Sequence, residues 1–462
     1  MNSAAKMLKR FCFTVTVLLK LLFFGLCAGA YILIMGDNIA SLLRPTRTSG
    51  IVLAAFTLTY IFMTKVYGGM EIGVKKSKPI IYTMLVTLLF TDLSANLFLS
   101  IMASSPLHDG RFVFESPLHL LAVYGVQVLI SVLMAYFGNW AFFKLHPAAS
   151  CLIITKPGTD LEELTATVGS YRKQYRHIHA IYYDNPDLEE EILGAEAVFF
   201  YELSPEERTP GVLFAYRKKR DIYYSLELPD IVALRGRQMN FGDKSFIASP
   251  ETYMTFEQRC IKRAMDILLS TLGLVILSPI LLLTALAIKL EDGGSIFYRQ
   301  ERATFGGRVF KVIKFRSMRE DKGNEHRSVT TDDDRITRVG RLIRKFRIDE
   351  LPQLINILKS DMSLVGPRPE MLENVEKYTA ELPEFVYRLR AKAGLTGMAQ
   401  IYGKYNTTPK DKLMLDLSYI EQFSIWLDLK LLFQTVLVFF TPDDSTAAFK
   451  AEKPEEKEET HE

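Results

Sequence analysis

Apolar residues are gathered into a few long runs along this chain. Four runs, at about 11–35, 50–67, 80–102 and 118–143, reach the roughly 20 residues that a helix needs to cross a bilayer. Basic residues lie before the first run and between the second and third, whereas the other two loops carry fewer of them. By the positive-inside rule, the pattern predicts a four-helix transmembrane bundle over residues 1–147 with both ends in the cytoplasm.

Residues 148–245 show a different pattern, in which short apolar runs alternate with a helical stretch. The segments 150–156, 179–184 and 195–203 are typical of buried strands, and 161–175 is typical of a helix. We therefore expect a cytoplasmic Rossmann-like α/β module. The first strand is not followed by G-x-G-x-x-G, so a regulatory or scaffolding role is favoured, and nucleotide binding stays open.

A fifth apolar run follows within residues 262–290, and it contains Ser278-Pro279 near its middle. A proline inside a helix removes a backbone hydrogen bond and produces a kink. Because basic residues flank both ends, the positive-inside rule predicts a re-entrant helix that enters and leaves by the cytoplasmic face. An ordinary kinked fifth span is the alternative.

Composition adds little to this picture. The 462 residues suffice for two or three domains, 48% of them are hydrophobic, and a net charge of +3 gives no indication of nucleic-acid binding. The four cysteines lack the spacing of a metal or disulfide site, and the N-terminus is interpreted as a retained anchor. Residues 441–462 are highly charged and are predicted to be a disordered tail.

The candidate chemistry centres on the adjacent carboxylates Asp349 and Glu350, which follow a basic run and precede Leu351-Pro352. Proline is favoured in the first turn of a helix, so we expect a helix over 351–358 with the acidic pair at its start. In isolation such a pair is typical of a solvated helix face. Arginines and lysines just upstream could balance both carboxylates and a phosphate, which indicates a phosphate-handling site.

Several motifs occur in one order: Lys-Arg-x-x-Asp at 262–266, the Ser-Pro break, "KFRSM" at 314–318, "DELPQ" at 349–353, and "GPRP" at 366–369. Together they closely resemble the bacterial sugar transferase family, the polyprenyl-phosphate hexose-1-phosphate transferases of the monotopic phosphoglycosyl transferase superfamily. The resemblance covers about residues 258–440, and the preceding bundle and α/β module resemble the N-terminal half of the family's long form. It implies a mostly helical catalytic domain anchored by the re-entrant helix.

The resemblance also implies a reaction at the cytoplasmic face of the bacterial inner membrane. A UDP-sugar would give its sugar-1-phosphate to undecaprenyl phosphate and release UMP, in a bilayer whose lipids surround the enzyme. Asp349 would be the nucleophile that forms a phosphosugar intermediate, and Glu350 its partner, with Mg²⁺ associated with both. The residues expected to bind phosphate or substrate are Arg344, Arg368, Lys314, Arg316, Arg302 and Gln400, and those expected to anchor the membrane helix at the lipid headgroups are Lys262, Arg263 and Asp266.

Three positions depart from the family pattern. Arg347 stands where a small polar residue is usual, Ala393 precedes Gly394 in place of proline, and "YNTTPK" at 405–410 lacks the usual tryptophan. Sugar recognition therefore stays open, with glucose and galactose as the leading candidates, as do the polysaccharide pathway (exopolysaccharide, capsule or O-antigen) and assembly into a homo-oligomer.

Two other functions compete with the transferase. An aspartyl phosphatase would place D-x-D-x-T/V after a buried strand, but "DDDRIT" at 332–337 follows a polar stretch. An inactive scaffold for polymer export would not need the intact acidic pair or "GPRP". Release of UMP on addition of undecaprenyl phosphate would separate the three.

Overall fold

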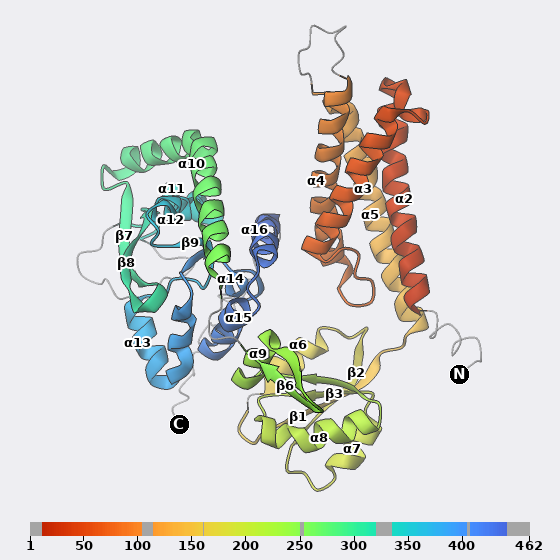
Figure 1. The fold of residues 1–462 in the computed structure, drawn as a ribbon, viewed down its shortest axis with the longest axis vertical. Coiled ribbons are helices and arrows are strands. Elements are labelled where there is room, and N and C mark those ends of the chain that lie inside the picture. Colours follow the sequence, from red (N-terminus) through yellow and green to blue (C-terminus); the bar gives the residue numbers. More distant parts are fainter. Residues whose placement is uncertain are drawn as a thin grey trace, which may run out of the picture. The chain divides into compact units, whose positions relative to one another are not determined.

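The computed structural model describes residues 12–103, 114–159, 161–249, 254–319, 335–403 and 407–440. The chain forms two compact units, Met1–Glu227 and Leu228–Glu462, and each is described by itself (Figure 1). The acidic run at 332–334 and the predicted disordered tail at 441–462 lie outside the described residues.

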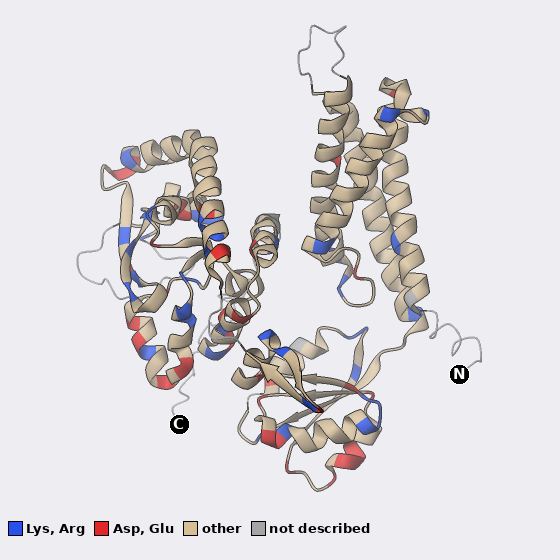
Figure 2. Ribbon diagram, viewed as in Figure 1, with Lys and Arg blue, Asp and Glu red and all other residues tan. Residues whose placement is uncertain are grey.

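The first unit begins with four long helices that pack side by side around a buried apolar core (Figure 1). All four are long and apolar enough to cross a membrane, and they carry few charged residues (Figure 2). Large apolar side chains such as Leu33, Leu58 and Leu118 are exposed on their outer faces, which fits membrane anchoring. The helices match the four predicted runs: α2 (Cys12–Asn38), α3 (Arg47–Tyr67), α4 (Ser77–Ala103) and α5 (Pro117–Leu145), with a short turn η1 (Ala40–Leu43) between the first two.

A parallel four-stranded sheet completes the first unit, in the order β2-β1-β3-β4. Strand β1 is central, and its last five residues are buried because helices cover the sheet. The sheet confirms the predicted α/β pattern. Its strands are β1 (Ala149–Thr155), β2 (Tyr175–Tyr182), β3 (Ala197–Phe200) and β4 (Asp221–Tyr224), and its helices are α6 (Leu161–Gly169), α7 (Leu188–Gly194) and α8 (Pro205–Arg217).

The α/β module ends earlier than predicted. We expected it to continue to residue 245, but the helix after β4, α9 (Leu228–Arg235), belongs to the second unit. Its Ile231 is fully buried in the core of that unit, where α9 packs on α15 (Pro409–Glu421). The boundary therefore falls between Glu227 and Leu228.

The described residues of the second unit are mostly helical, with two hairpins and one pair of short parallel strands. Its elements besides α9 and α15 are β5 (Arg237–Phe241), β6 (Lys244–Ala248), α10 (Phe256–Asp292), β7 (Phe297–Ala303), η3 (Phe305–Gly307), β8 (Val309–Phe315), α11 (Arg338–Lys345), η4 (Ile348–Glu350), α12 (Gln353–Leu358), β9 (Ser363–Val365), α13 (Leu372–Glu381), η5 (Pro383–Arg390), β10 (Gly394–Thr396), α14 (Met398–Tyr402) and α16 (Ile425–Phe440). The core of this unit joins strand β8, helix α12 and helix α15 through buried side chains such as Val312, Ile357 and Leu413.

Helix α10 contains the fifth apolar run and bends along its length (Figure 1). Pro279 lies inside the helix, and the Ser278 hydroxyl donates to the carbonyl of Val275 at 2.7 Å, one turn before it. Apolar side chains on both sides of the bend are exposed, among them Leu268 and Leu282.

The first turns of α10 are fixed to the interior of the second unit. Lys262 donates to the carbonyl of Val365 at 3.0 Å and pairs with the buried carboxylate of Asp428. The Asp266 carboxylate accepts hydrogen bonds from the Ser363 hydroxyl at 3.0 Å and the Leu364 amide at 2.9 Å. Lys262 is 8% and Asp266 3% exposed. The predicted contact of these two side chains with lipid headgroups is therefore wrong, because both lie inside the protein.

The last turn of α10 is fixed to the same unit. Asp292 pairs with Arg316, which follows β8, and the carboxylate of Glu291 accepts the backbone N–H groups of Arg338 and Val339 at the start of α11. Both ends of the apolar helix are thus held by one folded domain.

Candidate active site

The acidic pair lies in η4, a single 3-10 turn between α11 and α12. Arg347, just before it, adopts φ +53°, a left-handed conformation that is uncommon for a residue with a side chain and that turns the chain sharply. The predicted helix after the pair is present as α12, with Pro352 at its N-cap. Asp349 and Glu350 therefore occupy the short turn before the helix, which differs from the expected first helical turn.

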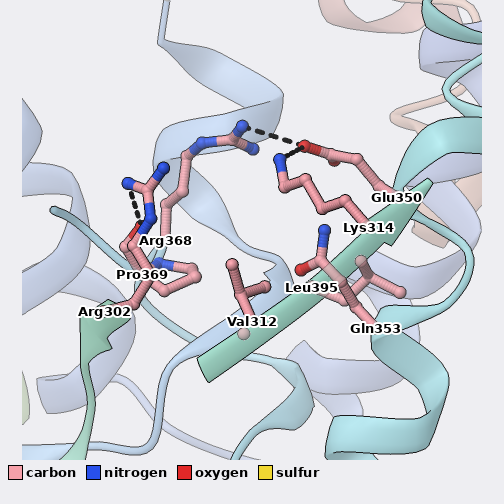
Figure 3. Close-up of a pocket in the computed structure, with 9 residues that line it drawn as sticks. Arg302, Val312, Lys314, Glu350, Gln353, Arg368, Pro369 and Leu395 are labelled. Carbon is pink, nitrogen blue, oxygen red and sulfur yellow. Dashed lines mark hydrogen bonds and ion pairs between the residues drawn. The ribbon is translucent and has the colours of Figure 1, made fainter. Parts of the chain in front are cut away.

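Two cations hold Glu350 in place. Lys314 from β8 contacts its Oε1 at 2.7 Å, and Arg368 from the Gly-Pro-Arg-Pro segment contacts the same oxygen at 3.1 Å (Figure 3). Burial would raise the pKa of Glu350, but the charges of Arg368 and Lys314 hold this pKa well below its usual range. Glu350 is therefore ionised at neutral pH.

Asp349 has the opposite electrostatic environment. Burial raises the pKa of Asp349 to about 6, and the negative charge of Glu350 adds to the increase, while Lys314 and Arg344 oppose it. Adjacent carboxylates whose pKa values are driven apart are typical of catalytic pairs. At pH 7 a group of this pKa is mostly ionised, so Asp349 can act as a nucleophile.

The pocket beside Glu350 is lined by cations from three separate segments. Arg302 from β7, Lys314 from β8 and Arg368 line it together with Gln353 (Figure 3). Arg302 is oriented by its bonds to the Pro369 carbonyl at 3.3 Å and the Gln300 side chain. The structure thus gathers three of the predicted phosphate-binding residues at one site, where they can neutralise an anion.

The other three predicted binding residues are placed differently. Arg316 is 8% exposed and pairs with Asp292 at the end of α10, so it is a structural residue outside this pocket. Arg344 acts on Asp349 through its charge, and its buried Nη1 has no hydrogen-bond partner among the described residues. Gln400, on α14, does not line the pocket.

Sequence reasoning missed Gln353 as a pocket residue. It is 3% exposed and lines the same pocket as Glu350. The signal was present, since Gln353 closes the "DELPQ" motif, one helical turn after Glu350.

The acidic pair is also the candidate metal site. Among the described residues there is no group of three or more His, Cys, Asp or Glu side chains with the arrangement of a protein-only metal site. Mg²⁺ commonly uses one or two carboxylates and completes its shell with water and substrate phosphates. Because Lys314 and Arg368 both contact Oε1 of Glu350, its Oε2 and the Asp349 carboxylate fit that coordination.

Comparison with known proteins agrees with this geometry. The family described as bacterial sugar transferase matches residues 257–442. A UDP-glucose:undecaprenyl-phosphate glucose-1-phosphate transferase of Caulobacter vibrioides is 44% identical over 191 residues, which are 40% of this chain and 71% of that protein. A UDP-N-acetylgalactosamine-undecaprenyl-phosphate N-acetylgalactosaminephosphotransferase of Aeromonas hydrophila is 43% identical over 39% of this chain and 44% of its own length.

A third relative, a UDP-glucose:undecaprenyl-phosphate glucose-1-phosphate transferase of Escherichia coli, is 37% identical over 46% of this chain and 48% of its own length. The matched portion is therefore less than half of two of these three relatives. The fold, the acidic pocket and the sequence similarity to these relatives together define the class of this protein as a transferase with long apolar helices. The chain belongs to the bacterial sugar transferase family.

Proposed function

We propose that this chain transfers a sugar-1-phosphate from a UDP-sugar to undecaprenyl phosphate and releases UMP. The observation that carries the proposal is the acidic pair, in which a half-buried Asp349 with a raised pKa adjoins a Glu350 that Lys314 and Arg368 hold ionised. A carboxylate nucleophile needs ionisation and nearby cations, and Asp349 has both, since it is mostly ionised at pH 7 and the charges of Lys314 and Arg344 act on it.

The proposed chemistry has two displacements. A carboxylate oxygen of Asp349 attacks the phosphorus attached to the sugar, the bond from that phosphorus to the bridging oxygen breaks, and UMP leaves. An oxygen of undecaprenyl phosphate then attacks the same phosphorus and displaces Asp349, which regenerates the carboxylate. Arg302, Lys314 and Arg368 reduce the repulsion between the anions that meet at the site. Mg²⁺, held by Asp349 and Glu350, would supply further neutralisation of the phosphate charge.

We place the catalytic domain at the cytoplasmic face of the inner membrane, with α10 as a re-entrant helix. Support comes from the two ends of α10, which contact one domain through Lys262 and Asp266 at one end and Asp292 at the other. The bend at Pro279 and the exposed apolar middle fit a helix that dips into the bilayer and returns.

The sugar is proposed to be a hexose, with glucose first because two of the three relatives are named for it. Galactose, and the N-acetylgalactosamine named for the Aeromonas relative, complete the donor panel. The lipid-linked product would initiate an exopolysaccharide, capsule or O-antigen chain.

The test is release of UMP by the purified chain from each UDP-sugar, with and without undecaprenyl phosphate. The proposal requires that UMP release in multiple turnovers depends on the acceptor and disappears in Asp349→Asn, while the exposed Asp187→Asn in the α/β module keeps the wild-type rate. Inorganic phosphate without acceptor would indicate a phosphatase instead. Complete inactivity of a folded preparation with every donor in the panel would favour the scaffold.

A further inference from the structure

The Gly-Pro-Arg-Pro segment at 366–369 carries Arg368, whose guanidinium contacts Glu350 at 3.1 Å (Figure 3). Proline has no backbone N–H, so Pro367 and Pro369 cannot donate hydrogen bonds to their surroundings. The position of Arg368 therefore depends largely on the groups that donate to the carbonyls of this segment.

Four consecutive carbonyls, those of residues 367–370, accept hydrogen bonds from other parts of the domain. The donors are the backbone N–H groups of Gly394 and Ala303 and the side chains of Arg302 and Arg388, which bond to the carbonyls of Pro367 at 2.8 Å, Glu370 at 3.3 Å, Pro369 at 3.3 Å and Arg368 at 2.8 Å, respectively. Arg302 lines the pocket beside Glu350, whereas Arg388 does not. The carbonyl of Arg368 itself is therefore held by a side chain from outside that pocket.

Arg388 is fixed in turn by a buried carboxylate. It lies on η5 and is 2% exposed. Its Nε and Nη2 contact Oδ2 of Asp416, on α15, at 2.9 and 2.6 Å. Asp416 is 1% exposed, and a carboxylate buried so deeply needs a paired cation. Because the same Nη2 donates to the Arg368 carbonyl, the guanidinium of Arg388 connects α15 to the segment that carries Arg368.

Glu370, the residue that follows this segment, makes a second connection to α15. Its Oε1 lies 2.8 Å from Nζ of Lys412 and 3.8 Å from Nη1 of Arg388. Lys412 and Asp416 are four residues apart, so they share one face of α15. Burial would raise the pKa of Glu370, but the charges of Arg388 and Lys412 hold this pKa below its usual range. Among these four residues the two cations balance the two carboxylates, which leaves no excess charge for an anionic ligand.

We propose that Arg388 and Asp416 are positioning residues for sugar-phosphate transfer, which hold Arg368 where it meets both Glu350 and the diphosphate of the donor. The inference rests on the proposed function, in which Arg368 reduces the repulsion between the anions at the site. Without Arg388, the Arg368 carbonyl loses its donor and the guanidinium of Arg368 moves. A displacement of about 1 Å at a reacting centre can slow the reaction about 100-fold.

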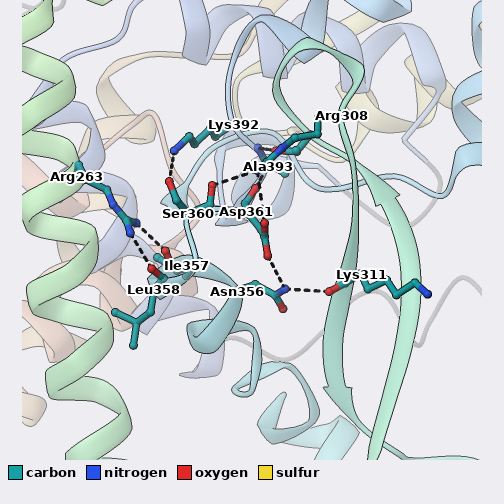
Figure 4. Close-up of polar contacts among 11 residues, drawn as sticks. Arg263, Arg308, Lys311, Asn356, Ile357, Leu358, Ser360, Asp361, Lys392 and Ala393 are labelled. Carbon is teal, nitrogen blue, oxygen red and sulfur yellow. Dashed lines mark hydrogen bonds and ion pairs between the residues drawn. The ribbon is translucent and has the colours of Figure 1, made fainter.

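Arg308 offers a control with the same kind of contacts elsewhere in the domain. Like Arg388, it donates to one backbone carbonyl, that of Ser360 at 3.2 Å, and contacts one carboxylate, that of Asp361 at 3.5 Å (Figure 4). It does not line the pocket at Glu350. Arg308→Lys should therefore keep the wild-type behaviour.

The test is a double-mutant cycle between Arg388→Lys and Arg368→Gln in the full chain, purified in detergent. A lysine keeps the charge but lacks the planar fork with which arginine bonds two acceptors at once. The measured quantities are the Kd of UDP, which is the part shared by the donors, and the rate of UMP release with undecaprenyl phosphate. Arg388→Lys should weaken UDP binding about tenfold and slow UMP release about 100-fold. When Arg368→Gln is already present, Arg388→Lys should change either quantity less than about threefold, whereas a purely structural role would give the same loss in both backgrounds.

Equal losses in the two backgrounds would overturn the proposal, as would wild-type behaviour of a folded Arg388→Lys or an equal loss in Arg308→Lys. If a thermal-shift assay finds Arg388→Lys unfolded, Lys412→Gln replaces it in the cycle, because the Lys412 side chain is 24% exposed and acts on Arg388 through Glu370. Its expected loss is about threefold, and no loss, or the same loss in both backgrounds, would overturn the proposal.

UDP binding separates this inference from the proposed function. Coupling in UDP binding without any UMP release leaves the positioning of Arg368 standing while the proposed function fails. UMP release without coupling defeats the positioning role alone, and a wild-type chain that binds no UDP would overturn both.

Discussion

The raised pKa of Asp349 makes the first displacement depend on pH in a way that an ordinary aspartate would not. The nucleophile is the ionised carboxylate, so its rate should rise with pH through about 6 and level off above that value. Glu350 stays ionised over the same range, because Arg368 and Lys314 hold its pKa far lower. The pH dependence of the rate should therefore show a single ionisation, that of Asp349.

The expected fall in rate between pH 7 and pH 5 follows from the pKa of Asp349. A group with a pKa of about 6 is about 91% ionised at pH 7 and about 9% at pH 5, so the rate should fall about tenfold between them. An aspartate with the usual pKa of about 3.9 would lose less than about a tenth of its rate over that interval.

The assay is a single turnover with UDP-sugar and no acceptor, quenched in acid and read by intact-protein mass. Leaving out undecaprenyl phosphate removes an acceptor whose own phosphate titrates near this range. Arg344→Gln should move the midpoint upward, because the charge of Arg344 lowers the pKa of Asp349. Lys345→Gln, the exposed neighbour on α11, is the charge-matched control and should leave the midpoint unchanged.

A rate that stays constant from pH 7 to pH 5, with the fold intact, would refute the assigned environment of Asp349. Equal midpoint shifts in Arg344→Gln and Lys345→Gln would show that general surface charge, and not Arg344 in particular, sets that pKa.

Three further predictions concern the site and the membrane helix. Glu350→Gln should lower transfer severely and weaken its magnesium dependence, and an unchanged magnesium titration would count against the metal role. Lys262→Met should lower the free energy of unfolding of the catalytic domain by about 3–5 kcal/mol, because it strands a buried carboxylate; a thermal-shift assay in detergent checks this. Ser278→Ala with Pro279→Ala should favour a spanning helix, and cysteine labelling from outside intact cells, near residue 325, would detect the reversal.

Local patterns in the sequence were sufficient for much of the fold. The four helices of the first unit follow from run length and hydropathy, because a bilayer sets the length of an apolar helix. The parallel sheet follows from short buried runs separated by helices, and β1 appears where "SCLIITK" predicts it. At the site, the motifs identified Glu350 together with Lys314 and Arg368, which the structure brings into contact.

What the sequence did not show depends on pairing between distant residues. Lys262 was expected at lipid headgroups because the family resemblance implies that role, but its partner Asp428 lies 166 residues further along. Arg316 stands two residues after Lys314 and was expected to share its role, but β8 ends at Phe315, so the alternation that puts residues i and i+2 on one face does not extend to Arg316. Arg316 therefore meets Asp292, and Lys314 meets Glu350.

The covalent step is tested by the intact mass of the purified chain after incubation with a UDP-sugar and no acceptor. We expect an added sugar-phosphate that maps to Asp349, forms together with UMP, and is removed by undecaprenyl phosphate. Asp349→Asn should show no adduct and no UMP. Transfer by Asp349→Asn at the wild-type rate, with deamidation excluded by peptide mass, would refute the assignment of Asp349 as the nucleophile.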